Sequence, residues 1–148
     1  MVRIQVLQKI VLFVCNYLNI HSDKDAIFTN GAGNFAIWSG KYLNYSKEHR
    51  LLAPQAGAMG AGVPAALAAK SIFPNRQVIC FAGDGDFQMS ASELGTAMQE
   101  GLNPIILIHN NGSYGTIRMH QEMRYPKRVS GTNLKNPNFK CIAEAYNF

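Results

Sequence analysis

Two short apolar segments, QVICFA (residues 77–82) and NPIILIHN (103–110), constrain the fold more than any other feature of the sequence. Their apolar residues run consecutively, without the polar alternation of a half-exposed strand. Such runs are typical of parallel strands that helices cover on both faces. Between them, FQMSASELGTAMQEG (87–101) predicts a helix that ends at Gly101, a residue type favoured just beyond helix C-termini. A strand, a helix and a strand in this order predict an α/β fold with a parallel sheet.

The rest of the chain continues this alternation. Further helices are expected over residues 3–19, 34–43, 57–73, 113–123 and 138–148, and a further strand over AIFTN (26–30). NYSKEHR (44–50) is expected to be a polar turn. The chain ends after a helix without a closing strand. We therefore expect residues 1–148 to form one domain, with a parallel sheet flanked by helices in a three-layer, Rossmann-like fold that is incomplete.

The composition predicts a folded domain with a substantial core, because 47% of the 148 residues are apolar and 16% are charged. The net charge of +5 is concentrated in residues 113–140, which indicates a solvated basic face or an anionic ligand. No nucleic-acid motif accompanies it, so we expect no nucleic-acid partner. Cys15, Cys80 and Cys141 form no C-x-x-C motif, which favours a reducing cytoplasm. No apolar run has the length of a membrane span, so no membrane partner is expected.

Three polar turns follow the predicted strands. They are TNGAGNF (29–35), AGDGDF (82–87) and HNNGSYG (109–115). Because ligands bind at the carboxyl ends of parallel strands, we expect the three turns to share one ligand. Asp84 offers an anionic oxygen, Asn111 an amide oxygen and the backbone near Ser113 a carbonyl. Such a set suits Mg²⁺, which often combines few protein ligands with phosphate oxygens. The glycines would let the backbone approach, and helix N-termini would supply N–H donors.

Two features of these turns have competing interpretations. GAGNFA (31–36) fits the G-x-G-x-x-A fingerprint of NAD and FAD sites, but the acidic candidate Glu48 lies in a polar turn instead of at the end of a strand. A turn without a ligand and a phosphate contact of another kind are the alternatives. Asp86 is interpreted as the N-cap of the following helix, or as an outer contact to a metal or water.

The segment GDGDFQMSASELGTAMQEGLNPIILIHNN (83–111) resembles the thiamine diphosphate motif, a Gly-Asp-Gly turn followed after a helix and a strand by Asn-Asn. Three more segments resemble their counterparts in acetolactate synthase-like enzymes. They are TNGAGNFAIW (29–38), QAGAMGAGVPAALAA (55–69) and NPNFKCIAEAYNF (136–148). The resemblance extends from about residue 20 to the end of the chain. It is to one domain only, the C-terminal diphosphate-binding domain of an enzyme normally built from three.

The resemblance implies thiamine diphosphate and Mg²⁺ as cofactors. The implied metal ligands are Asp84, Asn111 and the carbonyl of Ser113. The implied cofactor contacts are Gly33, Asn34, Gly57, Met59, Gly83, Gly85, Tyr114 and Gly115. In the family, a carbonyl at the position of Gly57 accepts from the aminopyrimidine, and a bulky side chain at that of Met59 supports the bent cofactor. The activating glutamate comes from a separate pyrimidine-binding domain, so no catalytic residue is implied in this chain.

The activity implied by the resemblance is decarboxylation of a 2-oxo acid such as pyruvate, followed by carboligation. A 2-oxo acid decarboxylase, a 2-hydroxyacyl lyase and a non-catalytic cofactor-binding subunit are the alternatives. The implied partners are the substrate, a pyrimidine-binding domain or subunit, and further copies of the chain in a dimer or tetramer. We expect the chain to be a fragment of a larger enzyme, inactive without the pyrimidine-binding domain.

Overall fold

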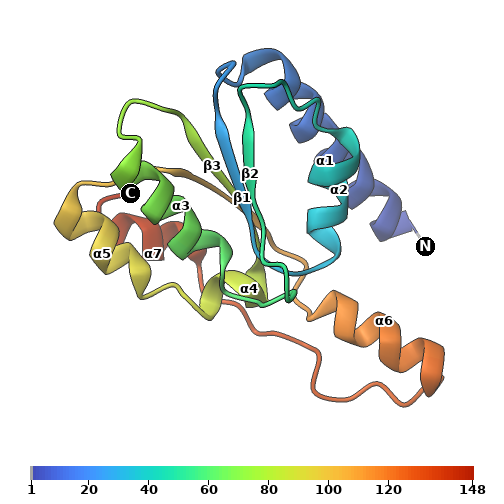
Figure 1. The fold of residues 1–148 in the computed structure, drawn as a ribbon. Coiled ribbons are helices and arrows are strands. Elements are labelled where there is room, and N and C mark those ends of the chain that lie inside the picture. Colours follow the sequence, from blue (N-terminus) through green and yellow to red (C-terminus); the bar gives the residue numbers. More distant parts are fainter. Residues whose placement is uncertain (1) are drawn as a thin grey trace.

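The computed structural model describes residues 2–148, with side chains from residue 10 onward, and its centre is a parallel sheet (Figure 1). The strands are β1 (Ile27–Asn30), β2 (Arg50–Leu52), β3 (Val78–Gly83) and β4 (Ile105–His109). They lie in the order β2-β1-β3-β4, and every pairing is parallel. The register aligns Phe28 with Ile79 and Phe81 with Leu107. The predicted parallel α/β sheet is confirmed.

Helices cover both faces of the sheet, as the apolar strands require. On one face lie α1 (Val2–His21) and α2 (Asn34–Tyr42), and on the other lie α3 (Gly62–Ile72), α4 (Asp84–Gln88), α5 (Glu93–Glu100) and α7 (Phe139–Ala145). Along β3, Ile79 and Phe81 point to the first face, whereas Val78, Cys80 and Ala82 point to the second. Each large apolar side chain buried in this way stabilises the fold by roughly 1.5–3 kcal/mol. The three-layer arrangement is therefore confirmed.

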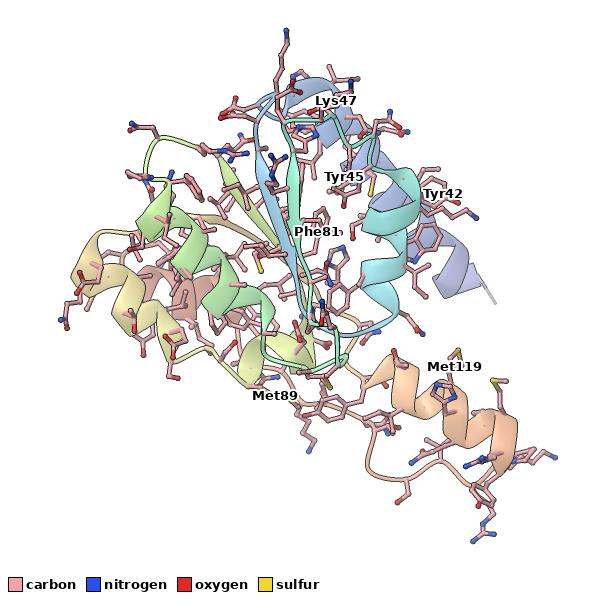
Figure 2. The ribbon with its side chains drawn as sticks, in the orientation of Figure 1. Tyr42, Tyr45, Lys47, Phe81, Met89 and Met119 are labelled. Carbon is pink, nitrogen blue, oxygen red and sulfur yellow. The ribbon has the colours of Figure 1, made fainter. Side chains whose placement is uncertain are left out.

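The helix α6 (Gly115–Arg124) extends away from the sheet, and residues 125–138 lead back from its far end to α7 (Figure 1). None of the residues of α6 is buried. Figure 2 shows the contrast between Phe81, which lies inside the fold, and Met119 on α6. Near its start α6 is tied to α2, where the Asn34 backbone N–H donates to Thr116 Oγ1, so α6 matters for the site mainly through its N-terminus.

The segment before α3 differs from the prediction in two places. Residues 50–52 form β2, a strand at the edge of the sheet whose side chains are all exposed, so its sequence lacks the pattern of a buried strand. The helix expected over 57–73 begins only at Gly62. Gly57 and Gly60 have φ of 64° and 82°, a left-handed conformation that ends any helix running back through them.

The segment after β3 also differs. The helix expected over 87–101 is two helices, α4 and α5, with turns between Met89 and Ser92. Its predicted end is confirmed, because Gly101 is left-handed, with φ of 64° and ψ of 30°. The strand β4 is less buried than expected, because it lies at the edge of the sheet and Ile105 is 46% exposed.

The strand order places a ligand crevice between β1 and β3. From β1 the chain continues into α2 on one face, whereas from β3 it continues into α4 and α5 on the other. The two loops therefore diverge at the carboxyl ends of adjacent strands. In open α/β sheets this point of divergence is where ligands bind.

Candidate functional site

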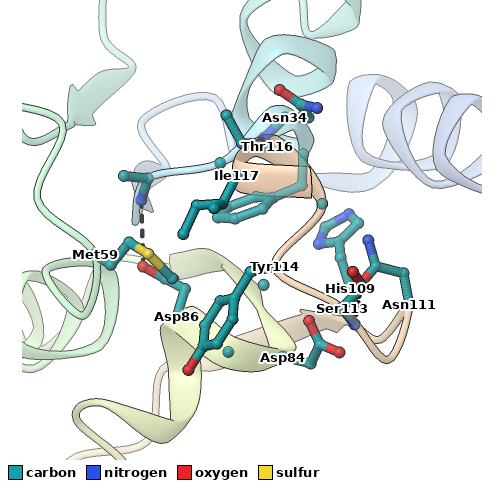
Figure 3. A pocket seen from close by; sticks show the side chains of 16 residues that line it. Asn34, Met59, Asp84, Asp86, His109, Asn111, Ser113, Tyr114, Thr116 and Ile117 are labelled. Carbon is teal, nitrogen blue, oxygen red and sulfur yellow. Dashed lines mark hydrogen bonds between the residues drawn. The ribbon is translucent and has the colours of Figure 1, made fainter. Parts of the chain in front are cut away.

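The three predicted turns meet at this edge and enclose a cavity of about 110 Å³ (Figure 3). Its lining comes from the chain that follows β1, β3 and β4, including the first turns of α2, α4 and α6, and from Met59 in the segment between β2 and α3. The lining residues are Ala32, Gly33, Asn34, Phe35, Met59, Gly83, Asp84, Gly85, Asp86, His109, Asn111, Ser113, Tyr114, Gly115, Thr116 and Ile117. All the site residues predicted from the sequence are among them except Gly57, which is exposed outside the cavity.

Two helix N-termini point toward this cavity. α2 begins after Gly33 and α6 after Tyr114, and neither of these residues caps its helix with a side chain. The two helices are tied together by the Asn34 backbone N–H, which donates to Thr116 Oγ1 at 3.0 Å. Backbone N–H groups and the helix dipoles give this side of the cavity a positive potential, which suits an anion such as a diphosphate.

Asp84 is one of two buried carboxylates of the site, with a residue exposure of 3%. Its Oδ2 accepts from the Gly112 backbone N–H at 2.7 Å and from Asn136 Nδ2 at 2.6 Å. Its Oδ1 has no hydrogen-bond partner among residues 2–148. The fold thus fixes the side chain through one oxygen and leaves the other for a ligand.

Asn111 lies two residues after the end of β4 and lines the same cavity as Asp84 (Figure 3). Its Oδ1 accepts from the Ser113 backbone N–H at 2.9 Å, which keeps the side chain folded over its own turn. An amide oxygen has two lone pairs, so one remains for a cation. No group of three His, Cys, Asp or Glu side chains that could hold a metal occurs in the described part of the chain. The donor set therefore fits Mg²⁺ that takes its remaining oxygens from a diphosphate and water.

Asn136 was not predicted as a site residue, although it holds Asp84 in place. Besides Asp84, its Nδ2 donates to Asn110 Oδ1 at 2.8 Å, and its Oδ1 accepts from Gln88 Nε2 at 3.0 Å. Asn136 lies 52 residues after Asp84, in the loop that follows α6. The residues themselves indicate only a turn at this point, because Asn136 is followed by Pro137. A turn signal does not indicate which distant residue the Asn136 side chain contacts.

His109 is a second residue of the site that was not predicted. Its ring stacks on Phe35, with centroids 5.5 Å apart, and on Phe81, with centroids 5.8 Å apart. Burial lowers the pKa of His109, and contacts with the carbonyls of Ala82 and Leu107 oppose this only in part. Burial therefore favours the neutral form of the imidazole. A Cβ on Gly33 or on Gly83 would lie 2.7 or 2.8 Å from the Phe35 ring, so the glycines make room for this stack.

Asp86 does not cap a helix, so the first of its two interpretations is wrong, and the second, an outer contact to a metal or water, stays a prediction. The residue lies inside α4, and its Oδ1 accepts from the backbone N–H groups of Ala32 and Gly60. An N-cap residue lies just before its helix and accepts from N–H groups of the first turn. Asp86 cannot do so, because α4 already begins at Asp84, two residues before it. Burial raises the pKa of Asp86, and N–H groups of Gly60, Ala32 and Gly83 partly offset that effect.

The dinucleotide interpretation of GAGNFA also lacks structural support. In dinucleotide folds an acidic residue ends the second strand and binds the ribose. Here Glu48 precedes β2, and that strand ends at Leu52.

Comparisons with known proteins agree with this geometry. Residues 31–148 match the family described as thiamine pyrophosphate enzyme, C-terminal TPP binding domain. An acetolactate synthase of Arthrospira platensis is 37% identical over 128 residues, which are 85% of this chain and 22% of that protein. The acetolactate synthase large subunit of Buchnera aphidicola is 41% identical over 123 residues, 82% of this chain and 21% of that subunit. The chain thus spans about a fifth of the length of these curated relatives.

A solved structure is also similar. The thiamine diphosphate-dependent 4-hydroxybenzoylformate decarboxylase of Rhodococcus jostii RHA1 superposes with a TM-score of 0.84 at 27% sequence identity. The superposition covers 92% of this chain and 26% of that enzyme. Together with the sequence matches, it confirms the resemblance to thiamine diphosphate-dependent enzymes. The chain belongs to the family of C-terminal, thiamine pyrophosphate-binding domains of these enzymes.

Proposed function

We propose that this chain binds the diphosphate of thiamine diphosphate through Mg²⁺ and forms one half of the active site of an acetolactate synthase-like enzyme. The main support is the convergence of Asp84, Asn111 and the N-terminus of α6 on one cavity. A carboxylate and an amide oxygen provide cation ligands, while the helix N-terminus faces an anion. A metal–diphosphate complex needs both kinds of group, because its cation binds oxygen ligands and its phosphates bind N–H donors.

In this proposal each group of the chain has a separate task. Asp84, Asn111 and the carbonyl of Ser113 hold Mg²⁺, while the backbone of Gly83, Gly85, Tyr114 and Gly115 and the loop residues Gly33 and Asn34 approach the diphosphate. Gly57 accepts from the aminopyrimidine, and Met59, which lines the cavity, supports the rings. The cofactor, when bound, supplies the electron sink for loss of CO₂ from a 2-oxo acid. The chain contributes position and electrostatic stabilisation, which is why its residues can be non-catalytic and still essential.

The rest of the active site has to come from elsewhere in this proposal. A pyrimidine-binding domain supplies the activating glutamate, a 2-oxo acid such as pyruvate is the substrate, and copies of the complete protein form a dimer or tetramer. Cys15 and Cys80 are buried thiols and Cys141 is exposed and free, which supports a reducing cytoplasmic compartment. Among the described residues, no helix combines the length and the apolar character that crossing a membrane requires.

The test is calorimetric titration of the full chain with thiamine diphosphate in the presence and absence of Mg²⁺. Asp84→Ala is expected to weaken Mg²⁺-dependent binding by more than about a hundredfold, because loss of a ligand exceeds the 10–100-fold effect of losing an outer contact. Asp23→Ala is the matched control, since it removes a carboxylate at the opposite end of the sheet. Wild-type binding that is absent, or that does not depend on Mg²⁺, would contradict the proposal.

One alternative activity has specific support, because the similar Rhodococcus enzyme is a decarboxylase. Adding the pyrimidine-binding partner and pyruvate separates the candidates. A carboligase forms acetolactate, and a simple decarboxylase forms acetaldehyde. A non-catalytic subunit binds the cofactor and yields neither product.

A further inference from the structure

Asp86 is a carboxylate of the cavity that the proposed function does not use. It is 2% exposed and lies in the middle of the short helix α4. Its Oδ1 accepts from the Gly60 backbone N–H at 2.7 Å and from the Ala32 backbone N–H at 3.2 Å. Figure 3 shows this side chain next to Met59, with the contact to Ala32 drawn as a dashed line.

The two N–H groups belong to different loops. Ala32 is in the loop after β1, 54 residues before Asp86, and Gly60 is in the segment between β2 and α3, 26 residues before it. A single oxygen atom therefore joins three segments that are distant in sequence. A buried backbone N–H without a hydrogen-bond acceptor costs free energy. The contact with this oxygen therefore stabilises the observed position of both loops.

The segment that carries Gly60 has little structure of its own. It lies between a three-residue edge strand and α3, and both Gly57 and Gly60 are left-handed. Such a segment has many accessible conformations unless a contact fixes it. Met59, the residue directly before Gly60, is the residue of this segment that lines the cavity. Fixing Gly60 therefore fixes the position of Met59.

Gly31, in the loop after β1, lies directly against the Asp86 carboxylate. A Cβ on Gly31 would overlap the Asp86 carboxylate. The φ of Gly31 is not in the left-handed region, so its conformation is open to other residues and the close approach alone requires glycine. The loop after β1 is thus shaped around this carboxylate.

We infer that Asp86 is a positioning residue, which holds the Met59 segment against the cavity through Gly60 and anchors it to the loop after β1. The inference rests on the proposed function, because it assigns different tasks within the proposed cofactor site to the two carboxylates. Asp84 serves the metal and the diphosphate, whereas Asp86 sets the position of Met59, beside which the cofactor rings would lie. Asp86 acts as a hydrogen-bond acceptor here, so an amide oxygen at the same place should replace it.

The first test compares two probes in the full chain, Mg²⁺ with thiamine diphosphate and Mg²⁺ with inorganic diphosphate. Asp86→Ala is expected to weaken the first by about tenfold, the effect of losing one to two hydrogen bonds, and to change the second by less than about twofold. Asp86→Asn, which keeps Oδ1, is expected to restore binding of thiamine diphosphate. Asp84→Ala should abolish both. Equal effects of Asp86→Ala on the two probes, no effect on either, or failure of the Asn variant to rescue would overturn the inference.

A second test needs no cofactor. Amide hydrogen exchange at Ala32 and Gly60 should become at least about tenfold faster in Asp86→Ala. Ser46→Ala is the matched control, because Ser46 Oγ also accepts from two backbone N–H groups, those of Glu48 and His49, in a distant loop. Its exchange at Ala32 and Gly60 should equal that of the wild type. Unchanged exchange in Asp86→Ala would refute the role of Asp86 even if wild-type cofactor binding is intact. Conversely, faster exchange in a chain that binds no cofactor would refute the proposed function alone.

A double-mutant cycle tests the close approach of the Asp86 carboxylate to Gly31. Gly31→Ala should lower the melting temperature of the wild type by several degrees through its clash with the carboxylate. In an Asp86→Ala background the same substitution should lower it much less, because the carboxylate that the methyl group would overlap is absent. Additive effects of the two substitutions would show that the close approach is not real.

Discussion

Asn136 offers the sharpest test of how the site is assembled, because it touches Asp84 without lining the cavity. Asn136→Ala removes hydrogen bonds to Asp84 Oδ2 (2.6 Å), Asn110 Oδ1 (2.8 Å) and Gln88 Nε2 (3.0 Å). Each contributes about 0.5–1.5 kcal/mol when buried, and this side chain is only half-buried. We expect a loss of about 1–2 kcal/mol in the free energy of unfolding, which corresponds to a melting temperature lower by about 2–8 °C.

The larger expected effect of Asn136→Ala is on the metal. Groups that orient a ligand typically change metal affinity by about 10–100-fold, and Asp84 would keep only the Gly112 N–H as a support. Calorimetry with Mg²⁺ and thiamine diphosphate measures this change, and circular dichroism follows the melting. Asn133→Ala is the control in the same loop, because its amide accepts only from Arg118, at 3.3 Å. If Asn136→Ala melts earlier but binds Mg²⁺ as tightly as the control, Asn136 does not orient Asp84 and the reasoning fails.

Three further predictions concern the core and the turns. Burial raises the pKa of Cys80 from 9.0 to about 11, so its contribution to stability is complete below pH 9 and is lost as the pH rises toward 11. Urea unfolding should therefore show a decline of about 2–3 kcal/mol over that range that Cys80→Ala lacks. Gly101→Ala should cost about 1 kcal/mol in urea unfolding because its φ is 64°, whereas Gly95→Ala in the interior of the same helix should stabilise by about 0.5–1 kcal/mol; equal signs would contradict the backbone argument. Gly85→Ala should destabilise by about 1–3 kcal/mol, measured by thermal melting, because its methyl group would overlap the Tyr114 ring, and an unchanged melting temperature would refute that contact.

The sequence predicted those parts of the fold in which local pattern and burial agree. The strand β3, predicted over 77–82 and observed over Val78–Gly83, is buried on both faces, so an unbroken apolar run was a sufficient sign of it. The edge strand β2 has only exposed side chains and therefore no such pattern. The start of α3 was misplaced because the small residues after Pro54 suit a helix that packs closely on a sheet, whereas the left-handed φ of Gly57 and Gly60 depends on contacts elsewhere in the fold.

The same distinction applies to the site. The position of Asp84 and Asn111 at one cavity could be predicted because they lie one and two residues after β3 and β4, and parallel strands bring their carboxyl ends together. Asn136 and His109 could not, because their roles depend on the path of a long loop and on aromatic stacking between segments. Asp86 was recognised as a candidate, but its N-cap interpretation was wrong, since its partners Ala32 and Gly60 come from two other loops.

The geometry of α4 explains why a turn beside a proposed diphosphate carries two carboxylates. Successive helical residues are rotated by about 100°, so residues two apart point in nearly opposite directions. Within the described part of the chain Asp84 Oδ1 is left without a hydrogen-bond partner, whereas Asp86 Oδ1 turns away to the N–H groups of Ala32 and Gly60. The negative charge of Asp86 is thus met by backbone dipoles, and the carboxylate that is left for a cation is that of Asp84. A diphosphate with Mg²⁺ would then face one free carboxylate oxygen and two helix N-termini, an arrangement in which each charge has an opposite partner.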